Sequence, residues 1–309
     1  MQILGMGNAI VDVICKVDEN FISQNNLTKS NMKLIFDENE FKNLLSNLKI
    51  EKTISGGSVA NSIVGLSQLG NEVGFIGKIS KDDLGEKYEA GLKKENVKYF
   101  YQKKVETLPT GTCLILITPD SERTMCTFLG TAGKINENDV DLEAIKKSDI
   151  IFLEGYLWDE GNPKKAFDKA ISNANKVAMT LSDRFCVDRH KNHFFNLVKN
   201  NLDIIFANED EISSLIDAKS FDEVISFGKE IKKQLIITRG EKGAISICSE
   251  KVSEVGINKD LKIIDLTGAG DLFAAGYLHG YLNNFSQEDC LKKGTEMASK
   301  VIQQIGARL

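Results

Sequence analysis

The stretch Asp265-Leu266-Thr267-Gly268-Ala269-Gly270-Asp271 is followed by the apolar run Leu272-Phe273-Ala274-Ala275-Gly276-Tyr277-Leu278. We predict a short strand that includes Ile263 and Ile264, a tight turn of small residues, and a helix from about Gly268 to Leu282. At such a helix start, backbone N–H groups point outward with the positive end of the helix dipole. Because Gly and Ala let a ligand approach these groups closely, the stretch predicts an anion site.

Asp271 is unexpected beside an anion site, because a carboxylate repels phosphate. We interpret Asp271 as a general base that removes a proton from an attacking hydroxyl group. The N–H groups of Gly268, Ala269 and Gly270 would then stabilise the charge that develops on a transferred phosphoryl group. The simpler alternative is a glycine turn in which Asp271 only complements the helix dipole.

Composition places the chain among ordinary globular proteins. It has 309 residues, of which 42% are hydrophobic and 27% are charged, so about two domains or one large domain are expected. A net charge of −5 argues against broad nucleic-acid binding. We expect no membrane partner and a cytoplasmic location, because the N-terminus does not resemble a signal peptide and no run approaches ~18 apolar residues. The 6 cysteines form no C-x-x-C pair, which is typical of a reducing compartment.

Strand and helix patterns alternate along most of the chain, which predicts an α/β fold with a mostly parallel sheet. Strands are expected near 2–6, 73–76, 150–153, 177–181, 204–207 and 235–238, and helices near 58–69, 84–94, 163–175, 188–200, 209–232 and 286–304. Two β-like segments, Thr112–Thr118 and Arg123–Phe128, have no helix between them. We therefore expect an antiparallel hairpin in a small added sheet.

Polar residues follow the first predicted strand. Asn8 and Asp12 lie just beyond its carboxyl end, where α/β sheets bind ligands, and they suit vicinal hydroxyl groups. Ordinary loop polarity is the alternative. A dinucleotide fingerprint is excluded, because Ile10 occupies its third glycine position, and no G-x-x-x-x-G-K-[ST] phosphate loop is present.

A second glycine turn, Ser55-Gly56-Gly57-Ser58, opens the helix expected near 58–69. Gly56 and Gly57 would let a hydroxylated ligand reach the backbone, and Asn61 lies one helical turn further on. The alternative is that Ser58 simply caps the helix.

Two further motifs follow strands. Asn208-Glu209-Asp210-Glu211 could hold Mg²⁺ through water molecules, or it could be an acidic first helical turn. In Thr238-Arg239-Gly240-Glu241-Lys242-Gly243, backbone groups and the Thr238 hydroxyl could bind nucleotide phosphates, or the segment could be a plain hairpin turn.

Together, these motifs resemble the ribokinase-like (PfkB) family of carbohydrate and nucleoside kinases along nearly the whole chain. Asp265–Asp271 matches the D-x-T-G-A-G-D signature of that family, although Leu266 is an unusual residue at its position. Asn208 and Glu211 match an N-x-x-E motif linked to Mg²⁺ and phosphate. The N-terminal signature has Ser80 where Gly is common, but fits at Gly56, Gly57, Asn61, Gly70, Gly77 and Gly85.

The resemblance implies one kinase domain over 1–309, a three-layer α/β/α sandwich with a mostly parallel sheet and a small β-sheet lid from about 13–36 and 97–128. It implies an ATP- and Mg²⁺-dependent kinase with Asp271 as base, and members often hold a monovalent cation such as K⁺ near Asp265 and Ile305–Ala307. The acceptor-binding residues implied are Asn8, Asp12, Gly56, Gly57, Ser58 and Asn61. The nucleotide-binding residues implied are Asn208, Glu211, Thr238, Gly240, Gly243 and Thr267, with Asn208 and Glu211 also holding Mg²⁺ indirectly.

Five segments are similar to the adenosine kinase branch of the family: Leu27–Lys29 with Asn31, Gly56–Ser62, Glu122–Met125, Leu181–Phe185 (with Arg184 in place of Pro) and Ile305–Arg308. This similarity implies that Arg123 approaches the transferred phosphate, that Phe185 stacks on a base, and that Ala298, Val301 and Ile302 line the adenine pocket.

The expected reaction converts adenosine to AMP at its primary hydroxyl. A kinase for a free sugar such as ribose or fructose is the alternative within the family, and a ligand-binding protein without turnover is the alternative outside it. Both a monomer and a homodimer paired through the lid strands are compatible with the sequence.

Overall fold

The computed structural model describes residues 1–120, 122–158, 163–257 and 260–309. Its large sheet contains β1 (Ile3–Met6), β5 (Val73–Ile76), β6 (Lys98–Tyr99), β9 (Ile150–Glu154), β10 (Val177–Thr180), β11 (Ile204–Asn208), β12 (Gln234–Thr238), β13 (Ala244–Cys248) and β14 (Lys251–Val255). The strand order is β14-β13-β12-β11-β10-β9-β1-β5-β6. From β12 to β6 neighbouring strands are parallel, and β13 and β14 complete one edge as antiparallel strands.

Both faces of the large sheet are buried, which explains why its central strands are continuous apolar runs. In β11, Ile204 and Phe206 point into one hydrophobic core, whereas Ile205 and Ala207 point into the core on the opposite face. The two cores follow from the alternation of side chains along an extended strand.

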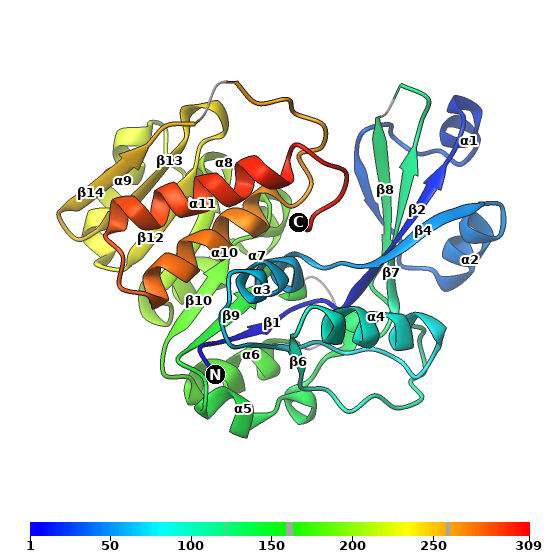
Figure 1. The fold of residues 1–309 in the computed structure, drawn as a ribbon, viewed down its shortest axis with the longest axis horizontal. Helices are drawn as coiled ribbons and strands as arrows, with labels where there is room; N and C mark the ends of the chain where they lie inside the picture. The colour runs from blue at the N-terminus through cyan, green and yellow to red at the C-terminus, as the bar shows by residue number, and fades with distance from the viewer. Residues whose placement is uncertain (121, 159–162, 258–259) are drawn as a thin grey trace.

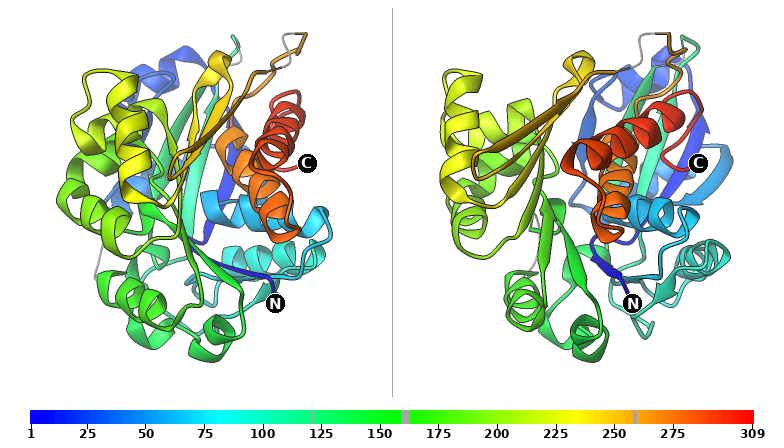
Figure 2. Two further views of the ribbon diagram at one scale, coloured as in Figure 1. Left: turned by 90° about the vertical axis from the view of Figure 1, so that its left-hand side faces the viewer. Right: turned by 60° about the vertical axis from the view of Figure 1, so that its left-hand side comes forward.

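Helices form an outer layer on each face of this sheet (Figures 1 and 2). One layer contains α3 (Ser58–Gln68), α10 (Ala269–Leu282) and α11 (Gln287–Val301), and the other contains α6 (Pro163–Asn173), α7 (Arg184–Asn200), α8 (Glu209–Ile216) and α9 (Phe221–Ile231). The shorter α5 (Leu142–Lys146) packs beside α6, and α4 (Asp83–Lys94) packs against β6. The predicted three-layer α/β/α architecture is confirmed.

A second sheet stands beside the large one (Figure 1). This small sheet consists of β2 (Ile10–Lys16), β3 (Met32–Leu34), β4 (Ile50–Ser55), β7 (Gly111–Ile117) and β8 (Arg123–Phe128), in the order β3-β8-β7-β2-β4. The predicted antiparallel hairpin is present as β7 and β8. Two helices, α1 (Glu19–Gln24) and α2 (Glu38–Ser46), accompany the small sheet, and Phe41 of α2 stacks on Phe128 of β8.

The boundaries of the small sheet differ from the expected 13–36 and 97–128. Its first strand begins at Ile10, and Ile50–Ser55 adds an edge strand that the sequence did not reveal. Lys98–Tyr99 instead pairs with β5 of the large sheet. These pairings depend on contacts between distant segments, so local sequence patterns do not encode them.

Three other elements also differ from the prediction. The single helix expected over 209–232 is divided, because Asp217 adopts a left-handed conformation and Ser220 caps α9. The hairpin β13–β14 was not predicted. Ile263 and Ile264 form no strand and are 60% and 50% exposed, so the strand expected before the glycine turn was wrong.

Among the described residues, no helix has the length and apolarity needed to cross a bilayer.

Candidate functional site

Two cavities lie where parallel strands of the large sheet end, and a third lies beside the small sheet. The Asp12 cavity (about 580 Å³) lies between the small sheet, α4 and residues 305–309. The Asp271 cavity (about 390 Å³) lies at the start of α10, and the Ala298 cavity (about 770 Å³) lies between α11 and the β12–β13 turn. The last two share the lining residues Thr238, Leu266, Ala269, Gly270 and Phe273, and Asn61 connects the first two, because it lines the Asp12 cavity and donates to Asp271.

Asp271 lies in the first turn of α10, at the centre of this arrangement. Ser58 Oγ donates to Asp271 Oδ1 over 2.7 Å, and Asn61 Nδ2 donates to Asp271 Oδ2 over 2.9 Å. Burial raises the pKa of Asp271 to about 6, although these two hydrogen bonds and the charge of Arg308 lower it. At neutral pH, the group is therefore mostly a carboxylate that can accept a proton.

The start of α10 offers backbone donors beside this carboxylate. Within the described ranges, the N–H groups of Gly268 and Gly270 have no protein acceptor, whereas Ala269 donates to the Leu266 carbonyl over 3.2 Å. Two of the three predicted anion-binding N–H groups are thus free in this structure. Gly268 has a φ of +80°, and a Cβ there would lie 2.6 Å from Ala307 Cα, so the turn requires glycine.

Glu154, which the sequence analysis did not select, holds the loop that follows β1. Glu154 Oε1 accepts from the N–H and Nδ2 of Asn8 over 3.2 and 3.0 Å, and Oε2 accepts from the N–H of Val59 over 3.0 Å. Burial raises the pKa of Glu154 to about 7. Glu154 could have been identified from the sequence, because α/β sheets bind ligands at the carboxyl ends of their strands and Glu154 ends β9 beside the end of β1.

Asn8 is buried behind the cavities and does not line them. Asn8 Oδ1 is buried and has no hydrogen-bond partner among the described residues, so it remains available to accept a hydrogen bond. Gly57 packs directly against Asn8: it has a φ of +94°, and a Cβ there would lie 2.4 Å from the Asn8 carbonyl oxygen. The close approach accounts for the glycine at position 57.

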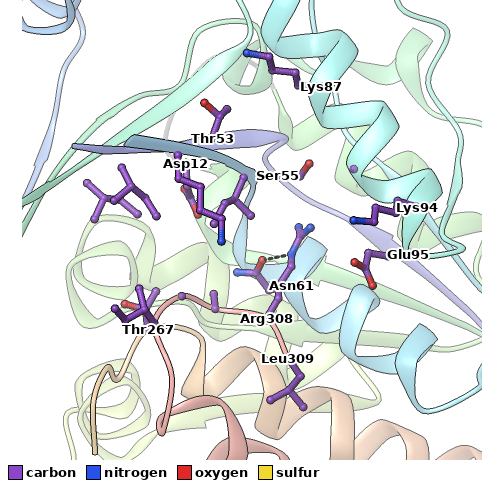
Figure 3. A pocket seen from close by; sticks show the side chains of 18 of the residues that line it. Asp12, Thr53, Ser55, Asn61, Lys87, Lys94, Glu95, Thr267, Arg308 and Leu309 are labelled. Carbon is purple, nitrogen blue, oxygen red and sulfur yellow. Dashed lines mark hydrogen bonds between the residues drawn. The ribbon is translucent and has the colours of Figure 1, made fainter. Parts of the chain in front are cut away.

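The Asp12 cavity gathers charged side chains from distant parts of the chain (Figure 3). Burial raises the pKa of Asp12 to about 7, Arg308 lowers it, and Asp271 raises it further. Arg308 Nε donates to Asn61 Oδ1 over 2.9 Å, and its Nη2 lies 3.5 Å from the Gly56 carbonyl oxygen. Arg308 was not predicted as a site residue, because no local pattern links a residue near the C-terminus to position 61.

Arg123 of β8 also lines the Asp12 cavity, but not the Asp271 cavity. Its Nη1 lies 2.6 Å from Asp265 Oδ2, which also accepts from the N–H of Gly306 over 2.7 Å. Asp265 Oδ1 accepts from the N–H and Oγ1 of Thr267. The donors around Asp265 do not fit the monovalent cation expected there, because an arginine already balances its charge.

Asn208 and Glu211 line the Asp271 cavity and form a reciprocal cap at the start of α8. Burial raises the pKa of Glu211 to about 7, and the nearby Asp183 and Asp210 raise it further. Among the described residues, no cluster of three or more acidic, His or Cys side chains is arranged to hold a metal ion directly.

The Ala298 cavity contains Thr238, Gly240, Gly243 and Ala298 among its lining residues, as the nucleotide prediction requires. Val301 is fully buried against Leu272 and Met297, so the prediction that it lines this pocket was wrong. Ile302, which was predicted for the same pocket, does line the cavity.

Phe185 is likewise not brought into the site. It is 70% exposed on the first turn of α7 and lines none of the three cavities. Thr267, predicted to bind nucleotide, lines the Asp12 cavity on the other side of Asp271.

The structure does bring together Asp12, Asn61 and Asp271. It also places Ser58 in contact with Asp271 and Gly56 in contact with Asp12.

Comparison with known proteins adds independent evidence. The chain matches the model of the pfkB family of carbohydrate kinases over residues 23–309. A solved adenosine kinase from Sinorhizobium meliloti is 34% identical with a TM-score of 0.91, and the match covers 100% of this chain and 95% of that one. A solved probable sugar kinase from Rhizobium etli CFN 42 is 35% identical with a TM-score of 0.90, over 99% and 94% of the two chains. Adenosine kinase 2 of Arabidopsis thaliana is 26% identical over 98% of this chain and 94% of its own length.

The match to the family model, the two similar structures and the D-x-T-G-A-G-D turn at the start of α10 agree with one another. They confirm the ribokinase-like fold and a phosphotransferase that acts on a hydroxyl group of a nucleoside or sugar. The chain belongs to the pfkB family of carbohydrate kinases.

Proposed function

We propose that this kinase transfers the γ-phosphoryl group of ATP to the primary hydroxyl of a nucleoside, with adenosine as the preferred acceptor. The main support for this proposal is the position of Asp271, because its carboxylate lies between the Asp12 cavity and the free N–H groups of Gly268 and Gly270. A nucleoside in the Asp12 cavity and a nucleotide in the Ala298 cavity would then approach each other at the Asp271 carboxylate.

The chemistry follows from this placement. Asp271 accepts the proton of the attacking hydroxyl, the hydroxyl oxygen forms a bond to the γ-phosphorus, and the bond from that phosphorus to the bridging oxygen of ADP breaks. The N–H groups of Gly268 and Gly270 donate to the oxygens on which negative charge develops. Asp12 accepts from the ribose hydroxyls and thereby orients the acceptor.

The cavity also favours a base-bearing acceptor. Ile14, Ile54 and Ile115 line it from three adjacent strands of the small sheet. Their side chains provide an apolar surface for the flat face of a base, whereas a bare sugar would leave that surface without a partner. In this proposal the small sheet acts as the lid of the site.

Asn208 and Glu211 fit a magnesium ion held through water molecules. Glu211 is buried, each of its oxygens accepts one hydrogen bond from Asn208, and further lone pairs face the Asp271 cavity. When bound, Mg²⁺ neutralises phosphate charge.

A kinase for a free sugar is the second candidate. The described lining of the Asp12 cavity contains no aromatic side chain, and a probable sugar kinase is as similar to this chain as the adenosine kinase is.

ATP consumption should be compared with adenosine, inosine, guanosine, ribose and fructose as acceptors, and the phosphorylated product identified by mass. We expect the highest kcat/KM with adenosine. A higher kcat/KM with ribose or fructose would overturn the nucleoside proposal in favour of the sugar kinase.

A further inference from the structure

Asn61 links the acceptor cavity to the base through the two ends of one amide. Its Nδ2 donates to Asp271 Oδ2 over 2.9 Å, and its Oδ1 accepts from Arg308 Nε over 2.9 Å. If the amide were reversed, its oxygen would face the Asp271 carboxylate and its NH₂ group would face a guanidinium, which only donates. Arg308 therefore permits the one amide orientation in which Asn61 donates to Asp271.

The Asp12 cavity is lined by several cations: Lys52, Lys87, Lys94, Arg123 and Arg308. Arg308 is the one whose charge lowers the pKa of both Asp12 and Asp271, and it also interacts electrostatically with Glu95 at the end of α4 and with the buried Tyr88. Glu154 of β9 adds a further carboxyl group that interacts with Asp271. Burial raises the pKa of both Asp12 and Asp271, and Arg308 lowers the pKa of both.

The segment that carries Arg308 is held in place by contacts with three other parts of the chain. The N–H of Gly306 donates to Asp265 Oδ2 over 2.7 Å, Gln304 Nε2 donates to the Arg308 carbonyl over 2.5 Å, and Gln68 Nε2 of α3 donates to the Leu309 carbonyl over 3.0 Å. The position of the guanidinium is thus set by the fold, as Figure 3 shows for its contact with Asn61.

We propose that Arg308 is a positioning residue for phosphoryl transfer: it orients the Asn61 amide toward Asp271 and keeps Asp271 in the carboxylate form that accepts the acceptor proton. The inference rests on the proposed role of Asp271 as the base. It does not depend on which acceptor is preferred.

The sign of the expected pH effect follows from the charges. Removing the Arg308 cation raises the pKa of Asp271 and Asp12, so more of the enzyme is protonated at a given pH. Because these two carboxyl groups interact, the pKa value read from the acidic limb of the kcat/KM–pH profile belongs to the pair and not to one residue. We expect the acidic limb of kcat/KM to move to higher pH in Arg308→Ala by about one pH unit.

The experiment measures kcat and KM from pH 5 to 9 with whichever acceptor proves best. We expect Arg308→Ala to lose on the order of 10-fold or more in kcat near pH 6.5, less at pH 8.5, with the KM for ATP unchanged. Arg308→Lys keeps a cation but lacks the Nε donor. The acidic limb of kcat/KM should therefore return to its native pH, whereas kcat should recover only in part. The matched control is Lys147→Ala, which removes an exposed cation that pairs with Glu143 of α5 and should leave both parameters unchanged.

A double-mutant cycle separates positioning from a general structural effect. If Arg308 acts through Asn61, Arg308→Ala combined with Asn61→Ala should be little slower than Asn61→Ala alone. The proposal is overturned by a uniform loss at every pH together with additive effects in the cycle. Circular dichroism checks folding, and Arg308→Lys provides the same test should Arg308→Ala fail to fold. A sugar as best acceptor would refute the nucleoside proposal while leaving this test intact.

Discussion

Asp271 experiences two opposing influences on its proton affinity. Burial raises its pKa to about 6, while the donors Asn61 and Ser58 stabilise the ionised form. A base with a pKa slightly below the working pH is mostly ionised and yet binds a proton well enough to take it from a hydroxyl group.

We expect Asp271→Asn to fold and to bind the acceptor, because asparagine has nearly the same shape and its oxygen still accepts one of the two hydrogen bonds. Turnover should fall by ~10²-fold or more, since the amide cannot take up a proton. Steady-state kinetics and acceptor binding by calorimetry check this. Asp222→Asn, at an exposed position in the first turn of α9, is the control, and near-normal turnover of Asp271→Asn would remove Asp271 from its proposed role.

At the scale of elements, the start of α10 unites an anion site with a tight backbone turn. Two glycines two positions apart have different surroundings. Gly268 lies in the left-handed region against Ala307, whereas a Cβ at Gly270 would meet no atom within 4 Å. The backbone therefore requires glycine at position 268, whereas glycine at position 270 leaves open space at the proposed anion site.

We expect Gly268→Ala to lose more than ~2 kcal/mol of stability, from backbone strain and from the clash with Ala307. Gly270→Ala should be as stable as the native protein, because alanine is the better helix former. It should nevertheless lose about 10-fold or more in kcat/KM, since its methyl group would project at the border of the Asp271 and Ala298 cavities. Denaturant unfolding and kinetics on both variants check the contrast; a Gly270→Ala variant with native kcat/KM would contradict it.

At the scale of the whole molecule, the small sheet stands beside the large sheet and borders the Asp12 cavity. The ion pair between Arg123 of β8 and Asp265 joins the small sheet to the segment that precedes α10. Its side chains are 17% and 4% exposed, so the pair is largely shielded from water. The contact therefore couples the position of the small sheet to the glycine turn.

We expect Arg123→Ala to lower stability by roughly 3 kcal/mol, because Asp265 remains buried with its other donors but without a balancing cation. The KM for the acceptor should rise, since the small sheet is held less firmly over the Asp12 cavity. Lys33→Ala is the control, because it removes a cation from the same sheet whose pair with Glu40 is exposed and contributes little. Equal melting temperatures and equal KM values for the two variants would argue against this coupling.

Local patterns were sufficient wherever one segment determines its own structure. The helices that begin after Gly268, at Ser58 and after Asn208 were all predictable, because apolar periodicity acts over a few residues. The alternative that Ser58 simply caps its helix was wrong, since Gly57 is the N-cap and no side chain caps this helix. The division at residues 217–220 was missed, since this short interruption leaves the apolar pattern of the two flanking helices nearly unbroken. Val301 was misplaced because a helix has an apolar face whether that face lines a pocket or a core.

By itself, the amino-acid sequence determined the α/β class and the glycine turn at the start of α10, and it led to the proposal that Asp271 is the base. Only the tertiary structure decided which partners surround that base. Asn61 and Asp271 are 210 positions apart and Asn61 and Arg308 are 247 apart, so their hydrogen bonds form only when α3, α10 and residues 305–309 pack together. The physical reason is that burial and the summed field of distant charges set the state of Asp271, and neither is encoded in the neighbouring residues.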